Sequence, residues 1–158
     1  MKRIQSLLLI ALTVAAISSG RAEGNEAAKK DLAKLQGEWS LVSGITDGYP
    51  IPDTMLSNSK RICKGDELTA IVGGQLIMKA RITLAPSKEP KAIDYDGSAG
   101  LNNGKKLLGI YQLDGDTFKS CFGAPGAERP KDFASKPGAK RTSTVWKRVK
   151  AAAKPEQK

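Results

Sequence analysis

The sequence of 158 residues contains no histidine, only two cysteines, and only 5% aromatic residues. Serine-hydrolase and cysteine–histidine nucleophile systems use an imidazole base, and most catalytic zinc sites need an imidazole ligand. The lack of histidine therefore excludes these kinds of chemistry. An enzyme would have to use carboxylates, lysine or tyrosine, and no recognisable catalytic set of these residues is present. We accordingly expect a non-enzymatic protein with no cofactor.

The carboxylates fall short of a metal site. Asp94 with Asp96, and Asp114 with Asp116, lack the number and spacing of oxygen ligands found in calcium-binding loops. The second pair flanks Gly115 and is typical of a hairpin turn. The sequence therefore predicts no metal-binding residues.

One marked apolar run, residues 7–17, is much shorter than the roughly 20 residues of a membrane-spanning helix. Lys2 and Arg3 precede this run, and the small residues Gly20 and Ala22 follow it, as in a secretory signal peptide. We predict that residues 1–22 are a signal peptide cleaved after Ala22 and that the protein is exported, periplasmic or secreted. An uncleaved anchor is the alternative; after cleavage no transmembrane segment would remain.

The charge is unbalanced, with 26 Lys and Arg against 16 Asp and Glu and a formal net charge of +10. Basic residues are scattered along the chain, so most are expected on a solvated surface. A basic exported protein meets anionic envelope polymers more often than nucleic acid, and no basic motif interleaved with aromatic residues is present. We expect no nucleic-acid binding and retain contact with an anionic envelope polymer as an alternative.

Cys63 and Cys121 are the only cysteines. An even number in an exported chain permits one disulfide. Each cysteine also lies in a strand-like run, where it could serve as a small apolar core residue. We favour two unpaired thiols and leave the disulfide as the alternative.

Local patterns predict one short helix followed by strands. Residues 26–35 have the apolar spacing of an amphipathic helix, which ends before Gly37. Beyond it, apolar and polar residues alternate in short runs separated by Gly, Pro, Asn and Asp, as in antiparallel strands. We predict strands at 38–46, 59–64, 67–72, 75–84, 92–95, 105–113, 117–122 and 142–149. Residues 123–140, which contain three prolines, are predicted to form a long loop.

These strands predict an all-β fold. Closing the sheet on itself removes its unpaired edges and leaves room inside for side chains or one small ligand. We therefore predict a small antiparallel up-and-down β-barrel of about eight strands at residues 37–149, with a two-sheet sandwich as the alternative. A short helix and linker at 23–36 would precede it, and a disordered basic tail at 150–158 would follow.

The G-x-W pattern at Gly37-Glu38-Trp39, where the helix gives way to the first strand, resembles that of the lipocalin and calycin barrels. The resemblance implies that Trp39 closes one end of the barrel. It also implies that an arginine near the last strand packs over the tryptophan, and Arg148 matches this position.

A longer resemblance, over most of residues 35–148, is to an uncharacterised lipocalin-like domain family abundant in planctomycete bacteria. It rests on the following segments in order: Leu35-Gln36-Gly37-Glu38-Trp39, Asp47-Gly48 with Pro50 and Pro52, Lys64-Gly65-Asp66, Lys88-Glu89-Pro90-Lys91-Ala92-Ile93-Asp94, Leu108-Gly109-Ile110-Tyr111-Gln112-Leu113-Asp114-Gly115-Asp116-Thr117, and Glu128-Arg129-Pro130-Lys131. The resemblance implies a barrel in an extracytoplasmic setting and leaves the function open. Cys63 and Ser120 depart from the family's aliphatic pattern, which predicts an interior that is not uniformly apolar.

Two sets of candidate site residues follow. An apolar ligand inside the barrel could be surrounded by Trp39, Leu41, Leu68, Met78, Ile82, Ile110 and Phe122, although the same side chains could fill the interior. Whether Ile110 or Tyr111 points into the barrel depends on the length of the turn at Asp114-Gly115-Asp116. A second candidate, the charged loop containing Glu128, Arg129, Lys131 and Phe133, could form a recognition surface, or Arg129 and Phe133 could make internal contacts.

Two functional hypotheses remain. The protein could bind a small hydrophobic or amphipathic molecule without transforming it. Alternatively, it could be an envelope interaction or structural module with a filled barrel that contacts anionic polymers or proteins through its basic surface.

Overall fold

The computed structural model describes residues 18–150, with side chains from residue 23 onward. Residues 1–17 of the predicted signal peptide and residues 151–158 of the predicted tail lie outside this range. Among the described residues, no helix combines the length and apolar character needed to cross a membrane.

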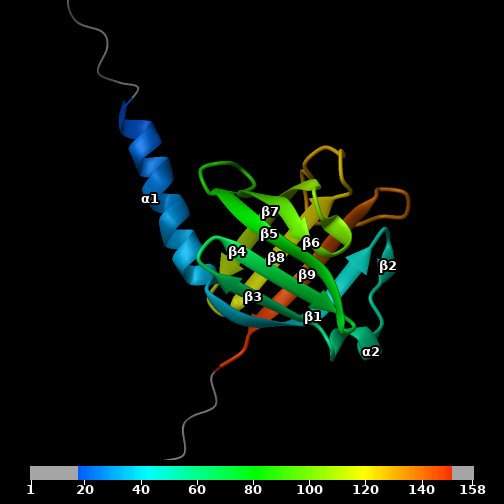
Figure 1. The fold of residues 1–158 in the computed structure, drawn as a ribbon. Helices are drawn as coiled ribbons and strands as arrows, with labels where there is room; N and C mark the ends of the chain where they lie inside the picture. Colours follow the sequence, from blue (N-terminus) through cyan, green and yellow to red (C-terminus); the bar gives the residue numbers. More distant parts are fainter. Residues whose placement is uncertain (1–17, 151–158) are drawn as a thin grey trace, which may run out of the picture.

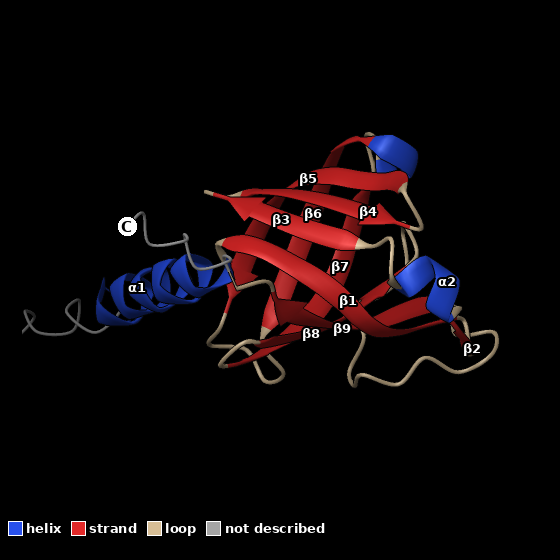
Figure 2. Cartoon of the chain, turned by 90° about the horizontal axis from the view of Figure 1, so that it is seen from below, coloured by secondary structure: helices blue, strands red, loops and turns tan. Residues whose placement is uncertain are grey.

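The fold is an antiparallel β-barrel (Figures 1 and 2). The strands follow the order β2-β1-β3-β4-β5-β6-β7-β8-β9, and β9 returns to pair with β1, which closes the sheet and excludes the sandwich. Short β2 pairs only with the end of β1, so the other eight strands form the barrel. The elements are α1 (Ser18–Leu35), β1 (Gly37–Thr46), β2 (Tyr49–Pro50), α2 (Asp53–Leu56), β3 (Lys60–Lys64), β4 (Glu67–Val72), β5 (Gln75–Ala85), β6 (Ala92–Ala99), the 3₁₀ turn η1 (Gly100–Asn102), β7 (Lys106–Asp114), β8 (Thr117–Gly123) and β9 (Arg141–Arg148).

All eight predicted barrel strands are present, and the differences lie at their ends. Helix α1 begins at Ser18 rather than at residue 26. The additional residues, 18–25, lack the apolar spacing from which the helix was predicted. Strand β6 continues to Ala99 rather than ending at residue 95. Gly97 lies inside this strand, and glycine is needed there because a Cβ would collide with the backbone carbonyl of Asn102 in η1.

Helix α1 lies at one end of the barrel (Figure 2), and buried core side chains fill that end. Trp39 is fully buried there, and its indole Nε1 donates a hydrogen bond to the Leu35 carbonyl at 2.9 Å, at the end of the helix. The Arg148 guanidinium lies 4.2 Å from the centroid of the Trp39 ring. Arg148 also donates to the Gln36 carbonyl at 2.7 Å, so this residue links the last strand to the chain that leaves α1.

A buried polar cluster ties the side of α1 to the barrel. The Asp31 carboxylate accepts hydrogen bonds from Lys91 and from the Tyr111 hydroxyl, each at 2.8 Å. Burial alone would raise the pKa of Asp31, but Lys91 and Tyr111 outweigh it and hold the pKa below its ordinary value. Burial, together with the Asp31 carboxylate, raises the pKa of Tyr111, so this hydroxyl stays protonated as a donor.

Candidate functional site

The barrel is hollow at the end opposite α1. A cavity of about 440 Å³ opens there, which lies within the range of pockets that hold small molecules. Its rim comes from the end of β1, the start of β9 and the chain that leaves β8, and its depth reaches the middle of the barrel. The apolar part of its lining consists of Ile51, Leu68, Ala70, Val72, Ile77, Met78, Leu107 and Phe122.

Strand alternation places most of this apolar wall. Leu68, Ala70 and Val72 are every second residue of β4 and therefore point to one face of the strand. Ile77 breaks the alternation of β5, yet it lines the cavity. Ala70 pairs with Met78 while Ile71 pairs with Leu76, so Ile77 is the extra residue of a β-bulge that turns its side chain inward.

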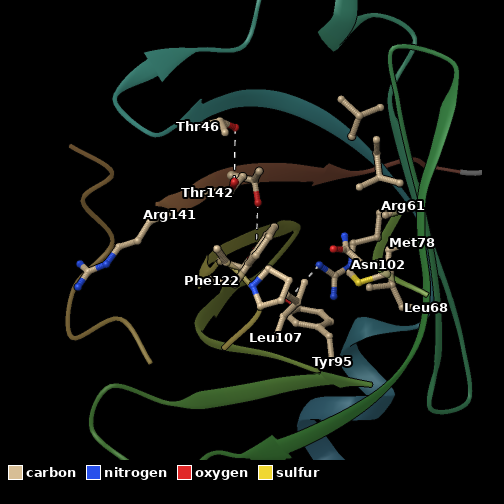
Figure 3. A pocket seen from close by; sticks show the side chains of 18 of the residues that line it. Thr46, Arg61, Leu68, Met78, Tyr95, Asn102, Leu107, Phe122, Arg141 and Thr142 are labelled. Atoms are coloured by element: carbon tan, nitrogen blue, oxygen red, sulfur yellow. Dashed lines mark hydrogen bonds between the residues drawn. The ribbon is translucent and has the colours of Figure 1, made fainter. Parts of the chain in front are cut away.

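The inner end of the cavity is polar. The Ser120 and Thr144 hydroxyls form a hydrogen bond at 3.0 Å, and the Trp146 indole Nε1 donates to Thr144 at 2.9 Å. Ser120 is only 1% exposed, so the interior is not uniformly apolar. Arg61 and Tyr95 also line this region, and Figure 3 shows the Arg61 guanidinium directed toward Tyr95.

Arg61 is a buried cation. Its side chain leaves β3 toward the barrel interior, the residue is 3% exposed, and the guanidinium carbon lies 4.2 Å from the Phe118 ring centroid. Nη1 donates a long hydrogen bond of 3.5 Å to the Tyr95 hydroxyl. Burial lowers the pKa of Arg61, but Tyr95 and Cys63 raise it, and the pKa ends above its ordinary value. The cavity therefore contains a permanent positive charge.

The predicted interior residues divide into three groups. Leu68, Met78 and Phe122 line the cavity. Trp39, Leu41 and Ile82 are buried in the core but do not line the cavity. Ile110 differs from its prediction because it is buried outside the main core cluster.

Ile110 lies on the outer face of β7. The turn at Gly115 pairs Leu113 with Phe118 and Tyr111 with Ser120, and Tyr111 belongs to the core cluster. Adjacent residues of a strand point to opposite faces, so Ile110 and its partner Cys121 face outward. They are nevertheless fully buried.

The loop at 124–140 packs beside this outer face. Arg129 donates to the Gly109 carbonyl at 2.6 Å and forms an ion pair with Asp94 at 2.7 Å, so it contacts both β6 and β7. The half-buried Phe133 ring lies 4.7 Å from the Lys119 ammonium. Glu128 and Lys131 are exposed. Arg129 and Phe133 thus make internal contacts, and the loop does not contribute Glu128, Arg129, Lys131 or Phe133 to the cavity.

Three of the four aspartates considered for calcium make separate ion pairs. Asp94 pairs with Arg129, Asp96 with Lys106 at 3.0 Å, and Asp116 with Arg148 at 3.0 Å. In the part of the chain that the structure describes, no group of three or more metal-ligating side chains comes together. Both cysteines are buried and free, with Cys63 in the barrel core and Cys121 on the outer face.

The sequence did not indicate that Arg61, Tyr95 and Leu107 line the cavity. A signal for Arg61 was present, since Cys63 was considered a core residue and residues two apart in a strand share a face. An arginine at an inward position of a strand is unusual because long charged residues are seldom buried without a partner.

The chain forms a closed antiparallel barrel with an interior cavity, preceded by a helix and with a tryptophan near the start of its first strand. This arrangement is that of a lipocalin-like barrel. No known family, curated protein or solved structure matches the chain. The resemblance to the lipocalin-like family of planctomycete bacteria therefore stays a prediction.

Proposed function

We propose that this protein is an exported, non-enzymatic binding protein that holds a small amphipathic molecule in the barrel cavity. The observation that carries the proposal is the cavity of about 440 Å³ at one end of the barrel, with an apolar wall and a polar inner end. An amphipathic molecule matches both parts of this lining, because its tail would contact the aliphatic side chains and its polar group would reach the interior donors.

Uptake of the neutral fluorescent probe N-phenyl-1-naphthylamine tests this proposal. We expect saturable fluorescence enhancement with the native protein and its loss in Ala70→Phe, because Ala70 lines the cavity and a phenyl ring would occupy that space. Thr69→Phe is the matched control, since Thr69 does not line the cavity. Equal binding by both variants, or no binding by the native protein, would contradict the proposal.

Native mass spectrometry of protein purified from its own exported fraction gives an independent test. An adduct that is lost on denaturation would support the binding function and provide the mass of the ligand. A bare chain that also takes up no probe, but is retained on an anionic polymer in a salt-sensitive manner, would favour the surface-interaction module.

Export is part of this proposal and is supported by the basic, apolar and small-residue pattern of residues 1–22. N-terminal sequencing of protein from the exported fraction should begin at Glu23. An intact Met1 in that fraction would contradict cleavage after Ala22.

A further inference from the structure

The strongest unexplained feature of the molecule is the charge of Arg61. Arginine remains protonated in proteins, and a buried cation is tolerated only where an anion and hydrogen-bond acceptors compensate for its lost hydration. Eight ion pairs link the described residues, and none of them includes Arg61. The neighbours of its guanidinium include the rings of Phe118 and Tyr95 and the thiol of Cys63. Within residues 23–150, the protein supplies this cation with no paired carboxylate.

The hydrogen-bonding atoms of Arg61 are also incompletely used. Nη1 reaches the Tyr95 hydroxyl, whereas Nε and Nη2 are buried and have no partner among the described residues. Nε and Nη2 carry the two parallel N–H groups along one edge of a guanidinium. A carboxylate, or two oxygens of a sulfonate or phosphate, binds this edge with two hydrogen bonds.

The position of this edge decides what could occupy it. Arg61 lines the cavity, so an anion that enters the cavity can reach the guanidinium. The Tyr95 hydroxyl accepts from Arg61 and keeps its own hydrogen available for the same anion. Between this polar end and the rim, Met78, Leu107 and Phe122 provide an apolar wall along the path of an attached chain.

We propose that the cavity takes a single-chain amphiphile with an anionic head and that Arg61 binds this head through its Nε and Nη2 edge. The tail would extend from Arg61 toward the rim formed by Thr46, Pro125 and Lys140. The proposal rests on the binding function given above and adds to it the charge of the head, the orientation of the ligand and the residue that selects it.

Displacement of N-phenyl-1-naphthylamine by decanoate and by 1-decanol tests the proposal, because these competitors share a tail and differ in head charge. Two hydrogen bonds to a charged head should make the native protein prefer decanoate by at least about tenfold. Arg61→Met should remove this preference while 1-decanol still binds. Arg61→Lys should retain only part of it, because an ammonium lacks the two-pronged edge.

Arg81→Met is the control for net charge. Arg81 is exposed on β5 and pairs at the surface with Asp66, so its loss removes the same charge and should leave the preference unchanged. Each protein is first checked for cooperative unfolding. If Arg61→Met does not fold, Arg61→Gln and Arg61→Lys carry the comparison.

The outcomes separate this inference from the binding function. Equal displacement by decanoate and 1-decanol in the native protein would overturn the role of Arg61 and leave the binding function intact. A preference that survives in Arg61→Met, or that falls equally in Arg81→Met, would also overturn it. Absence of any probe binding by the native protein would overturn the binding function itself, and this inference with it.

Discussion

Replacing Arg148 by methionine should destabilise the barrel by about 3 kcal/mol, because one guanidinium joins the last strand, the first strand and the end of α1. The contact with the Trp39 ring at 4.2 Å is worth about 0.5–1 kcal/mol. The partly buried hydrogen bond to the Gln36 carbonyl at 2.7 Å adds about 1.5–2 kcal/mol. The ion pair with Asp116, whose side chain is 51% exposed, adds no more than about 0.5 kcal/mol.

Urea unfolding monitored by tryptophan fluorescence measures this loss directly. For a domain of this size, about 3 kcal/mol corresponds to a fall in Tm of roughly 10 °C. Arg148→Lys should recover less than half of the loss, because an ammonium cannot contact the ring and the carbonyl in the same geometry. Lys147→Met is the matched control, since Lys147 is the exposed neighbour on the same strand. A loss below about 0.5 kcal/mol, or one equal to that of Lys147→Met, would refute this account of the closed end.

Three further predictions concern other parts of the molecule. The pKa of Asp31 is lowered in the folded state, so its contribution to stability is present above the unfolded pKa of about 4 and is lost as the pH falls through the folded value. In Asp31→Asn, the free energy of unfolding measured with urea should therefore fall less steeply as the pH is lowered below about 4. An unchanged dependence on pH would contradict this. Arg129→Ala should lower stability by about 2 kcal/mol and leave decanoate affinity unchanged in the displacement assay, because Arg129 contacts strands and not the cavity. A loss of affinity without a loss of stability would instead support a recognition role. Thiol titration of denatured, unreduced protein should find both Cys63 and Cys121 free, with slow reaction in the native state because both are buried; absence of free thiol would show a disulfide.

The strands were predictable because the patterns that specify them involve residues close together in the sequence. Alternation of apolar and polar side chains along β4 and the glycines at the turns depend on residues close together in sequence. Gly65, Gly73 and Gly115 all adopt positive φ values in the hairpin turns between strands. The closure of the sheet was also expected, because eight short antiparallel strands otherwise leave two exposed edges.

The inward-facing residues were only partly predictable, because they depend on register and on packing between distant strands. Ile110 and Tyr111 could have exchanged roles until the turn at Gly115 set the pairing with β8. Ile77 could not be assigned from alternation, since it is the inserted residue of a bulge. Arg61 was overlooked because a charged residue is normally expected on the solvent face.

Residue type and short-range spacing are enough to predict the alternating strands, their turns and the lack of histidine chemistry. The filled end around Trp39 and the hollow opposite end, in contrast, became visible only in the three-dimensional arrangement of the strands. A cavity is the difference between the volume enclosed by the strands and the volume of the side chains directed into it, and both depend on long-range pairing. The same pairing brought Arg61 beside Tyr95 and Phe118, which places its charge on the wall of the cavity.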